Sequence, residues 1–248
     1  MSFRATDFEF RYRLWFIAGI FAVAFWCYSF DRMNVSVALS RAIAVAVHDR
    51  NPDAVDRYVR GFFVLGTFIV TGAALVRSWA ESYLHSSIVH DMDLHSDSLV
   101  ADGPYRHLRN PLYLGTDLLA LGIGFLASRT GFVVLAVGMT IFTYRLVFRE
   151  EAGLLASQGE NYRRFFASVP RFVPSLAPRV PAAGRRPNWV DGFTGEIFMW
   201  GCAVGMALFA ATENILYYWV AMGTGFAIYF VQALMRKRAA ARSTPGAA

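Results

Sequence analysis

The sequence predicts an all-α protein, a polytopic membrane bundle of about six transmembrane helices with one further helix at the membrane interface. Hydrophobic residues make up 56% of the 248 residues and charged residues only 17%, whereas a soluble domain carries about 25% charge. The apolar residues gather into six runs, each near the roughly 20 residues that a helix needs to cross a bilayer. Together these observations exclude a disordered chain, a coiled coil and a soluble enzyme.

The predicted spans follow one another at 14–30, 61–80, 112–128, 130–148, 197–212 and 215–235. The third and fourth spans are joined by a very short link, as are the fifth and sixth, so each pair is expected to form a tight helical hairpin. The run 35–47 is short and holds Arg41, so we interpret it as an interfacial helix. Trp26 and Tyr28 make the end of the first run bulky, which favours a retained helix over a cleaved signal peptide.

Charge predicts the orientation of these spans. Eighteen of the 24 Lys and Arg side chains flank one end of the predicted bundle, beside both termini and the polar stretches 81–111 and 149–195. The positive-inside rule places that end in the cytoplasm. The basic residues flank apolar runs rather than forming one patch, so the net charge of +6 predicts contact with anionic lipid and no nucleic-acid partner. Cys27 and Cys202 both lie in apolar runs, which excludes a disulfide scaffold.

Polar and aromatic residues crowd the start of the third span. Gly103-Pro104 marks a turn, and Pro111 stands where the first turn of a helix tolerates proline. Because the third and fourth spans form a tight hairpin, the segment 145–151 is expected to return beside the segment 105–113. The pattern predicts a two-sided site with aromatic rings, cations and carboxylates at a membrane surface. The alternative is a belt of snorkelling anchors without a ligand.

Four sequence blocks point to a family. Gly103-Pro-Tyr-Arg-His-Leu-Arg-Asn-Pro-Leu-Tyr-Leu-Gly115 is followed by Glu150-Glu151-x-x-Leu154, Gly159-Glu-x-Tyr162 and Val169-Pro-Arg-Phe-Val-Pro174. In this order and spacing they resemble the isoprenylcysteine carboxyl methyltransferase and phospholipid methyltransferase superfamily over residues 60–176. The resemblance implies an integral membrane methyltransferase that uses S-adenosylmethionine and takes a lipid or lipidated acceptor from the bilayer. That acceptor would be an isoprenylcysteine-like carboxylate or a phospholipid amine.

The resemblance also implies which residues form the site. Carried over position by position, the cofactor-binding residues are His90, Asp97, Ser98, Leu99, Val100, Tyr105, Arg109, Asn110, Pro111, Leu112, Tyr113 and Glu150. Arg145, in the last turn of the fourth span, is implied as the catalytic residue that holds an anionic acceptor group. The family's histidine is Asn110 here, and an amide cannot titrate. A carboxylate acceptor needs no base, whereas a lipid amine must first lose a proton.

With this resemblance the chain divides into three parts. Residues 1–60 hold the N-terminal transmembrane helix and the interfacial segment, 61–176 the methyltransferase core, and 177–248 a linker and a C-terminal helical hairpin. In that hairpin Gly201 with Gly205, and Gly223 with Gly225, have spacings that let helix backbones approach closely in lipid.

Other interpretations of the sequence compete with methyl transfer. His85, His90 and His95 are spaced by five residues, which turns each about 140° from the last on a helix, so no metal site is expected. A membrane sterol-type NADPH reductase shares a related block but usually has Gly-Glu where this chain has Gly115-Thr116. A non-enzymatic transporter or assembly protein remains a further alternative. Asp117, inside the third span, is either functional or bonded to a neighbouring helix or Arg77. The acceptor and the oligomeric state are left open.

Overall fold

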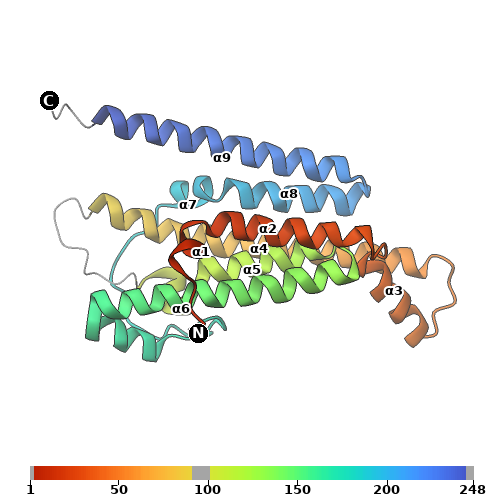
Figure 1. Cartoon of the computed structure of the whole chain (residues 1–248), viewed down its shortest axis with the longest axis horizontal. Coiled ribbons are helices and arrows are strands. Elements are labelled where there is room, and N and C mark those ends of the chain that lie inside the picture. Colours follow the sequence, from red (N-terminus) through yellow and green to blue (C-terminus); the bar gives the residue numbers. More distant parts are fainter. Residues whose placement is uncertain (1–2, 91–100, 244–248) are drawn as a thin grey trace.

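The computed structural model describes residues 3–90 and 101–243, and in that part every regular element is helical. The helices are α1 (Asp7–Arg11), α2 (Arg13–Trp26), α3 (Val35–Ala46), α4 (Ala54–His90), α5 (Pro111–Gly124), α6 (Arg129–Ser168), α7 (Trp189–Gly195), α8 (Ile197–Thr212) and α9 (Ile215–Ser243). Figure 1 shows the long helices side by side, with α8 and α9 along one edge of the bundle and α6 along the opposite edge. The all-α prediction is confirmed.

Three of these helices are long and apolar enough to cross a membrane, namely Ala54–Leu84, Arg129–Ser168 and Ile215–Met235. Helices α7 and α8 pass the same test together but are bent by 64°, which gives a fourth candidate. The apolar helices Arg13–Ser29 and Pro111–Gly124 are shorter, and the 14 residues of α5 rise only about 21 Å. Each of the six predicted runs is helical over most of its length, although the helix of the third run ends at Gly124 rather than at 128. The number of runs that cross the bilayer stays a prediction. The run that we expect at the membrane interface is the separate helix α3 at one end of the bundle (Figure 1).

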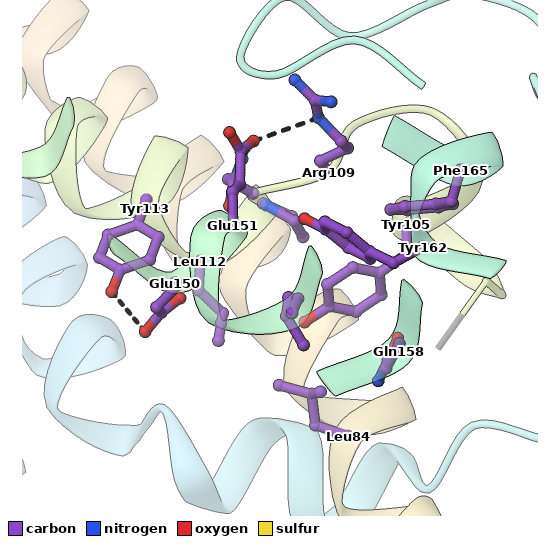
Figure 2. Close-up of a pocket in the computed structure, with 13 residues that line it drawn as sticks. Leu84, Tyr105, Arg109, Leu112, Tyr113, Glu150, Glu151, Gln158, Tyr162 and Phe165 are labelled. Carbon is purple, nitrogen blue, oxygen red and sulfur yellow. Dashed lines mark hydrogen bonds and ion pairs between the residues drawn. The ribbon is translucent and has the colours of Figure 1, made fainter. Parts of the chain in front are cut away.

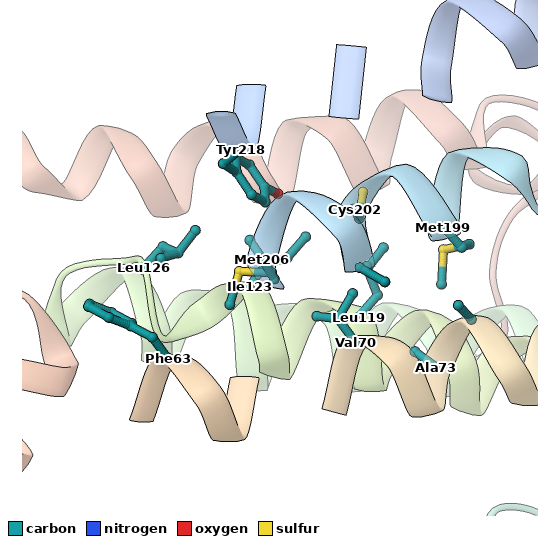
Figure 3. Close-up of a cluster of buried hydrophobic side chains, with 12 residues drawn as sticks. Phe63, Val70, Ala73, Leu119, Ile123, Leu126, Met199, Cys202, Met206 and Tyr218 are labelled. Carbon is teal, nitrogen blue, oxygen red and sulfur yellow. The ribbon is translucent and has the colours of Figure 1, made fainter. Parts of the chain in front are cut away.

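The central core joins α4, α5 and α8, and close helix packing builds it. Figure 3 shows Val70, Ile123 and Met206 meeting between these helices. A Cβ at Gly122 would lie 2.6 Å from Val70 Cγ2, so only glycine allows α4 and α5 this approach. The helices are held by packing and small residues, as expected for helix association in lipid.

The predicted glycine contacts of the C-terminal hairpin are largely confirmed. A Cβ at Gly201 would lie 3.0 Å from the Cα of Gly225, and one at Gly205 would lie 2.9 Å from the backbone oxygen of Tyr218. The prediction for Gly223 was wrong, since a side chain there would meet open space. Spacing identified the small residues but not which of them face the partner helix.

A cluster of hydrogen bonds fixes the turn between α5 and α6. Asp31, only 7% exposed, accepts hydrogen bonds from the backbone N–H of Thr130 at 2.8 Å and from the Arg129 guanidinium at 3.0 Å. Ser128 caps α6 by accepting from the N–H of Gly131 at 3.1 Å. These bonds make α6 return along α5, so that residues far apart in sequence meet at the other end of the hairpin. Farther along the same pair, Thr143 donates to Asp117 at 2.7 Å, so Asp117 bonds a neighbouring helix rather than Arg77.

Candidate active site

A cavity of about 370 Å³ lies where the C-terminal half of α4, the turn Gly103–Arg106 (η2), the start of α5 and the second half of α6 meet. Its volume falls in the range of small-molecule and cofactor sites. The lining residues, drawn in Figure 2, are Leu84, Tyr105, Arg109, Asn110, Pro111, Leu112, Tyr113, Glu150, Glu151, Leu154, Gln158, Tyr162 and Phe165. The segments that line it in α5 and the second half of α6 lie toward the same end of the bundle as the C-terminal end of α9 (Figure 1).

The turn η2 brings an aromatic ring into the wall. Gly103 has a φ of 56°, which favours glycine, and a side chain there would overlap the ring of Tyr83. Pro104 follows, and the next residue, Tyr105, is 9% exposed. Burial raises the pKa of the Tyr105 phenol, so this side chain stays neutral at physiological pH.

One side of the cavity carries a carboxylate that is held by a phenol. The hydroxyl of Tyr113, in the first turn of α5, donates to Glu150 Oε1 at 2.8 Å. In the described part of the chain no cation lies within ion-pair distance of Glu150, although Arg13 at the start of α2 is within electrostatic reach of it. The negative charge of Glu150 is therefore free to receive a cationic or hydroxyl group of a ligand.

The neighbouring carboxylate is used differently. Glu151 is 3% exposed and accepts from Arg171 at 2.9 Å and 3.1 Å, and Asn110 Nδ2 donates to it at 3.3 Å. Arg109 completes the cluster with Nε 3.3 Å from Glu151 Oε1, while its guanidinium stacks 3.9 Å above the Phe166 ring. Burial lowers the pKa of Arg109, and the Glu151 charge opposes that shift. This cluster ties the start of α5 to the segment after α6 and shapes the cavity wall.

A break in α6 shapes one wall of the cavity. Gly159 has φ 55° and ψ −125° inside the helix, a conformation that glycine adopts at low cost. Beyond this break the chain changes direction, so that Tyr162 and Phe165 line the cavity together with residues that precede the break. Gln158 stands at the break with its Oε1 buried and, among the described residues, without a hydrogen-bond partner.

The structure brings seven of the predicted cofactor residues together: Tyr105, Arg109, Asn110, Pro111, Leu112, Tyr113 and Glu150. His90 is the last residue of α4, and its side chain is not described. Asp97, Ser98, Leu99 and Val100 lie outside the described residues. Sequence reasoning did not assign a site role to Leu84, Glu151, Leu154, Gln158, Tyr162 or Phe165, although three of them stand in the quoted sequence blocks.

Arg145, the predicted catalytic residue, lies apart from this group. Its Nη2 donates to both carboxylate oxygens of Glu9 at 3.0 Å and 2.7 Å, and its backbone oxygen accepts from Ala5 at 2.9 Å. Arg145 does not line the cavity, and Glu9 satisfies its charge. These contacts dock the N-terminal segment on α6. The pKa of the Glu9 carboxyl is lowered, first by the hydrogen bond from the Thr6 backbone N–H and next by the hydrogen bond from Arg145.

Within the described ranges, no group of three His, Cys, Asp or Glu side chains is arranged to hold a metal ion. The side chains of His85, His90 and His95 are not described, so the sequence-based expectation of no metal at these histidines stays untested.

Part of the chain is similar in sequence to known methyltransferases and to one metal-resistance protein. Residues 59–158 match the family model described as phospholipid methyltransferase. The protein-S-isoprenylcysteine O-methyltransferase of Schizosaccharomyces pombe is 29% identical over 117 residues, 47% of this chain and 48% of that protein. The cobalt-zinc-cadmium resistance protein CzcN of Cupriavidus metallidurans is 30% identical over 114 residues, 46% of this chain and 49% of that protein. The chain thus spans about half the length of the curated relatives it matches, and no solved structure matches it.

Proposed function

Because residues 59–158 carry the sequence of the phospholipid methyltransferase family, we propose that this integral membrane protein is a methyltransferase that uses S-adenosylmethionine. The acceptor in this proposal is a lipid or a lipidated molecule that arrives from the bilayer. The observation that carries the proposal is the overlap of two findings: eleven of the thirteen cavity-lining residues fall inside the family match.

The residues of the cavity suit the cofactor. S-adenosylmethionine combines an ammonium group, a carboxylate, ribose hydroxyls, an adenine ring and a methyl-bearing sulfonium. Glu150, held by Tyr113 at 2.8 Å, offers a carboxylate to the ammonium or the hydroxyls. The rings of Tyr105 and Tyr162 offer aromatic surface. When bound, the cofactor supplies an electrophilic methyl group.

Methyl transfer is an in-line displacement, so the task of the protein is to orient the two reactants and to exclude water. Leu112 and Leu154 give the cavity apolar wall between its polar groups. Asn110 is hydrogen-bonded to Glu151 at 3.3 Å and cannot act as a base. These residues therefore favour an acceptor that is already nucleophilic, such as a carboxylate, while a lipid amine would need to arrive deprotonated.

The proposal also gives Arg145 a role and assigns the cavity to one face of the membrane. If Arg145 holds an anionic acceptor group, as the family resemblance implies, that group must replace Glu9 on its guanidinium. The positive-inside rule, applied to the 18 of 24 cations near this end, places both termini and the cavity at the cytoplasmic face.

Calorimetry with S-adenosylhomocysteine, the product of the proposed reaction, tests the cofactor site. The wild-type protein should bind it, and Glu150→Gln should weaken binding by about 1.5–3 kcal/mol, the range for a charged hydrogen bond. Glu213→Gln is a matched control, because Glu213 pairs with Arg60 in the turn between α8 and α9 and does not line the cavity. Binding of NADP instead of S-adenosylhomocysteine would replace the proposal by the reductase, and unchanged affinity in a folded Glu150→Gln variant would remove Glu150 from the site.

A further inference from the structure

The segment 170–186, between α6 and α7, combines exposed apolar side chains with exposed basic ones. Val173 is 78% exposed, and Leu176 is fully exposed. The stretch 161–190 contains six arginines and no Asp or Glu. Arg179 and Arg186 are exposed, and neither forms an ion pair with another described residue. The segment therefore presents apolar side chains and uncompensated positive charge to its surroundings.

Hydrogen bonds hold this segment in place, although it is neither helix nor strand. The backbone N–H of Ser175 donates to the oxygen of His107 at 3.0 Å, and that of Arg179 donates to the oxygen of Arg106 at 2.8 Å. Asp102, only 3% exposed, accepts from two backbone N–H groups near the end of the segment, at 2.8 Å and 2.9 Å. These bonds fix the segment on the turn η2 and its flanks.

Ring contacts place the segment at the level where two predicted spans end. The ring of Phe172 has its centroid 4.7 Å from that of Tyr144, four residues before the end of the fourth predicted span. The ring of His107, the residue that Ser175 bonds, lies 6.2 Å from that of Trp79, near the end of the second. Tyr and Trp are enriched where membrane meets water. The exposed apolar side chains of the segment stand next to these contacts in the chain, so they reach the depth of the interface.

We propose that residues 170–186 form an interfacial anchor that binds anionic phospholipid headgroups. Val173 and Leu176 enter the boundary between headgroups and acyl chains, while Arg179 and Arg186 contact lipid phosphates, which the planar guanidinium fork matches. The added positive charge favours a headgroup of net negative charge. Because the segment is bonded to η2, the anchor holds the cavity at headgroup depth. This inference requires only that the protein lies in a bilayer and does not depend on the proposed reaction.

Quenching of a fluorescent label by brominated lipid tests both the depth and the charge preference. The label is attached to Leu176→Cys of the whole chain in nanodiscs, since the native Cys27 and Cys202 are buried. Bromine near the headgroup end of the acyl chain is carried by phosphatidylcholine or by phosphatidylglycerol, at equal mole fraction. Both lipids should quench the label, and the site should prefer phosphatidylglycerol by about fivefold or more, the factor for one arginine at an anionic surface. The control is a label on Ser157→Cys, because Ser157 is exposed and lies about 13 Å beyond the fourth predicted span; neither lipid should quench it.

Two double variants test the arginines. Arg179→Gln with Arg186→Gln should reduce the preference for phosphatidylglycerol to within about twofold. Arg57→Gln with Arg60→Gln is the matched control and should keep the preference, because these arginines are 58% and 67% exposed at the other end of α4. A Leu176 label that neither lipid quenches would place the segment in water or against a protein partner, and overturns the anchor. Equal quenching by the two lipids, or an unchanged preference in the first double variant, overturns the assignment to anionic lipid.

Discussion

Replacing Glu196 by Met tests whether the C-terminal helices support the cavity. Glu196 stands at the bend between α7 and α8 and is 5% exposed. It accepts two hydrogen bonds from the Arg77 guanidinium of α4, each 2.7 Å long. The remaining nitrogen of that guanidinium donates to the Leu112 oxygen and to Thr116 Oγ1, both at 3.0 Å. A single half-buried cation therefore joins α4, the cavity-lining start of α5 and the C-terminal hairpin.

The expected loss in the free energy of unfolding depends on whether a substitution leaves an unpaired charge behind. Removing one partner of a buried ion pair costs about 3–5 kcal/mol, because the other charge stays buried and unpaired. The Arg77 side chain is 23% exposed, so partial solvation favours the lower end, about 3 kcal/mol. For a chain of this size that corresponds to a fall in Tm of about 6–12 °C. Replacing both Arg77 and Glu196 by Met leaves no charge behind and should cost less than about 1 kcal/mol.

Thermal unfolding in detergent micelles, with the single variants, the double variant and the wild type, measures this cycle. Glu213→Met serves as the control, since its pair with Arg60 is 46% and 67% exposed and should shift the Tm by less than about 2 °C. The affinity for S-adenosylhomocysteine should fall in Glu196→Met and return in the double variant, because Leu112 lines the cavity. A Glu196→Met variant as stable as the control, or a double variant that loses the sum of both single effects, would refute this reasoning.

Three further predictions concern other parts of the molecule. Arg145→Leu should strongly lower turnover of a prenylated cysteine acceptor and leave the affinity for S-adenosylhomocysteine within about twofold of the wild type. Glu9→Gln should lower the KM for that acceptor, because it frees Arg145. Unchanged turnover in Arg145→Leu would assign Arg145 to docking the N-terminal segment. Hydrogen bonds, first from the Thr130 N–H and next from Arg129, hold the pKa of Asp31 at about 2, so its contribution to stability is present above the ordinary value of 3.8 and is lost as pH falls toward 2. The Tm of Asp31→Asn should therefore fall less than that of the wild type over this range, and parallel Tm curves would contradict it. A cysteine substituted at Ser2 should react with an impermeant maleimide only in inside-out vesicles, and one substituted at Asn51 only in right-side-out vesicles. The native Cys27 and Cys202 are 3% and 0% exposed, so they should react little. The opposite labelling pattern would invert the topology.

Apolar runs predicted where helices lie better than how far they extend. The predicted run 197–212 coincides with α8, and 35–47 differs from α3 by one residue. In contrast, α4 has 37 residues and α6 has 40, about twice the lengths of their apolar runs. Hydropathy reports only the segment that suits lipid, whereas the helical hydrogen bonds continue into the polar ends. Those polar ends carry most of the cavity, including Glu150 and Gln158.

The cavity itself could be predicted in part because a tight hairpin returns the second helix beside the first. A turn at Ser128 forces Tyr113 and Glu150 to meet although 37 residues separate them. Arg145 was harder to place, because the hairpin fixes which ends of the helices meet but not which face of α6 each side chain leaves from. Five residues at about 100° each turn Arg145 about 140° away from Glu150, which points the two side chains to different faces of α6. The break at Gly159 lies in a quoted block, but nothing in its spacing showed that the helix turns there.

The paired carboxylates of the chain show how one short motif serves two purposes. Glu150 and Glu151 are adjacent, so their side chains leave α6 about 100° apart. That rotation directs Glu150 toward Tyr113 and Glu151 toward Arg109 and Arg171. The second carboxylate is neutralised twice within the protein and stabilises the wall, so it has little charge left to offer a ligand. The first has a neutral phenol as its hydrogen-bond donor, so a cationic ligand gains most of its electrostatic attraction from Glu150.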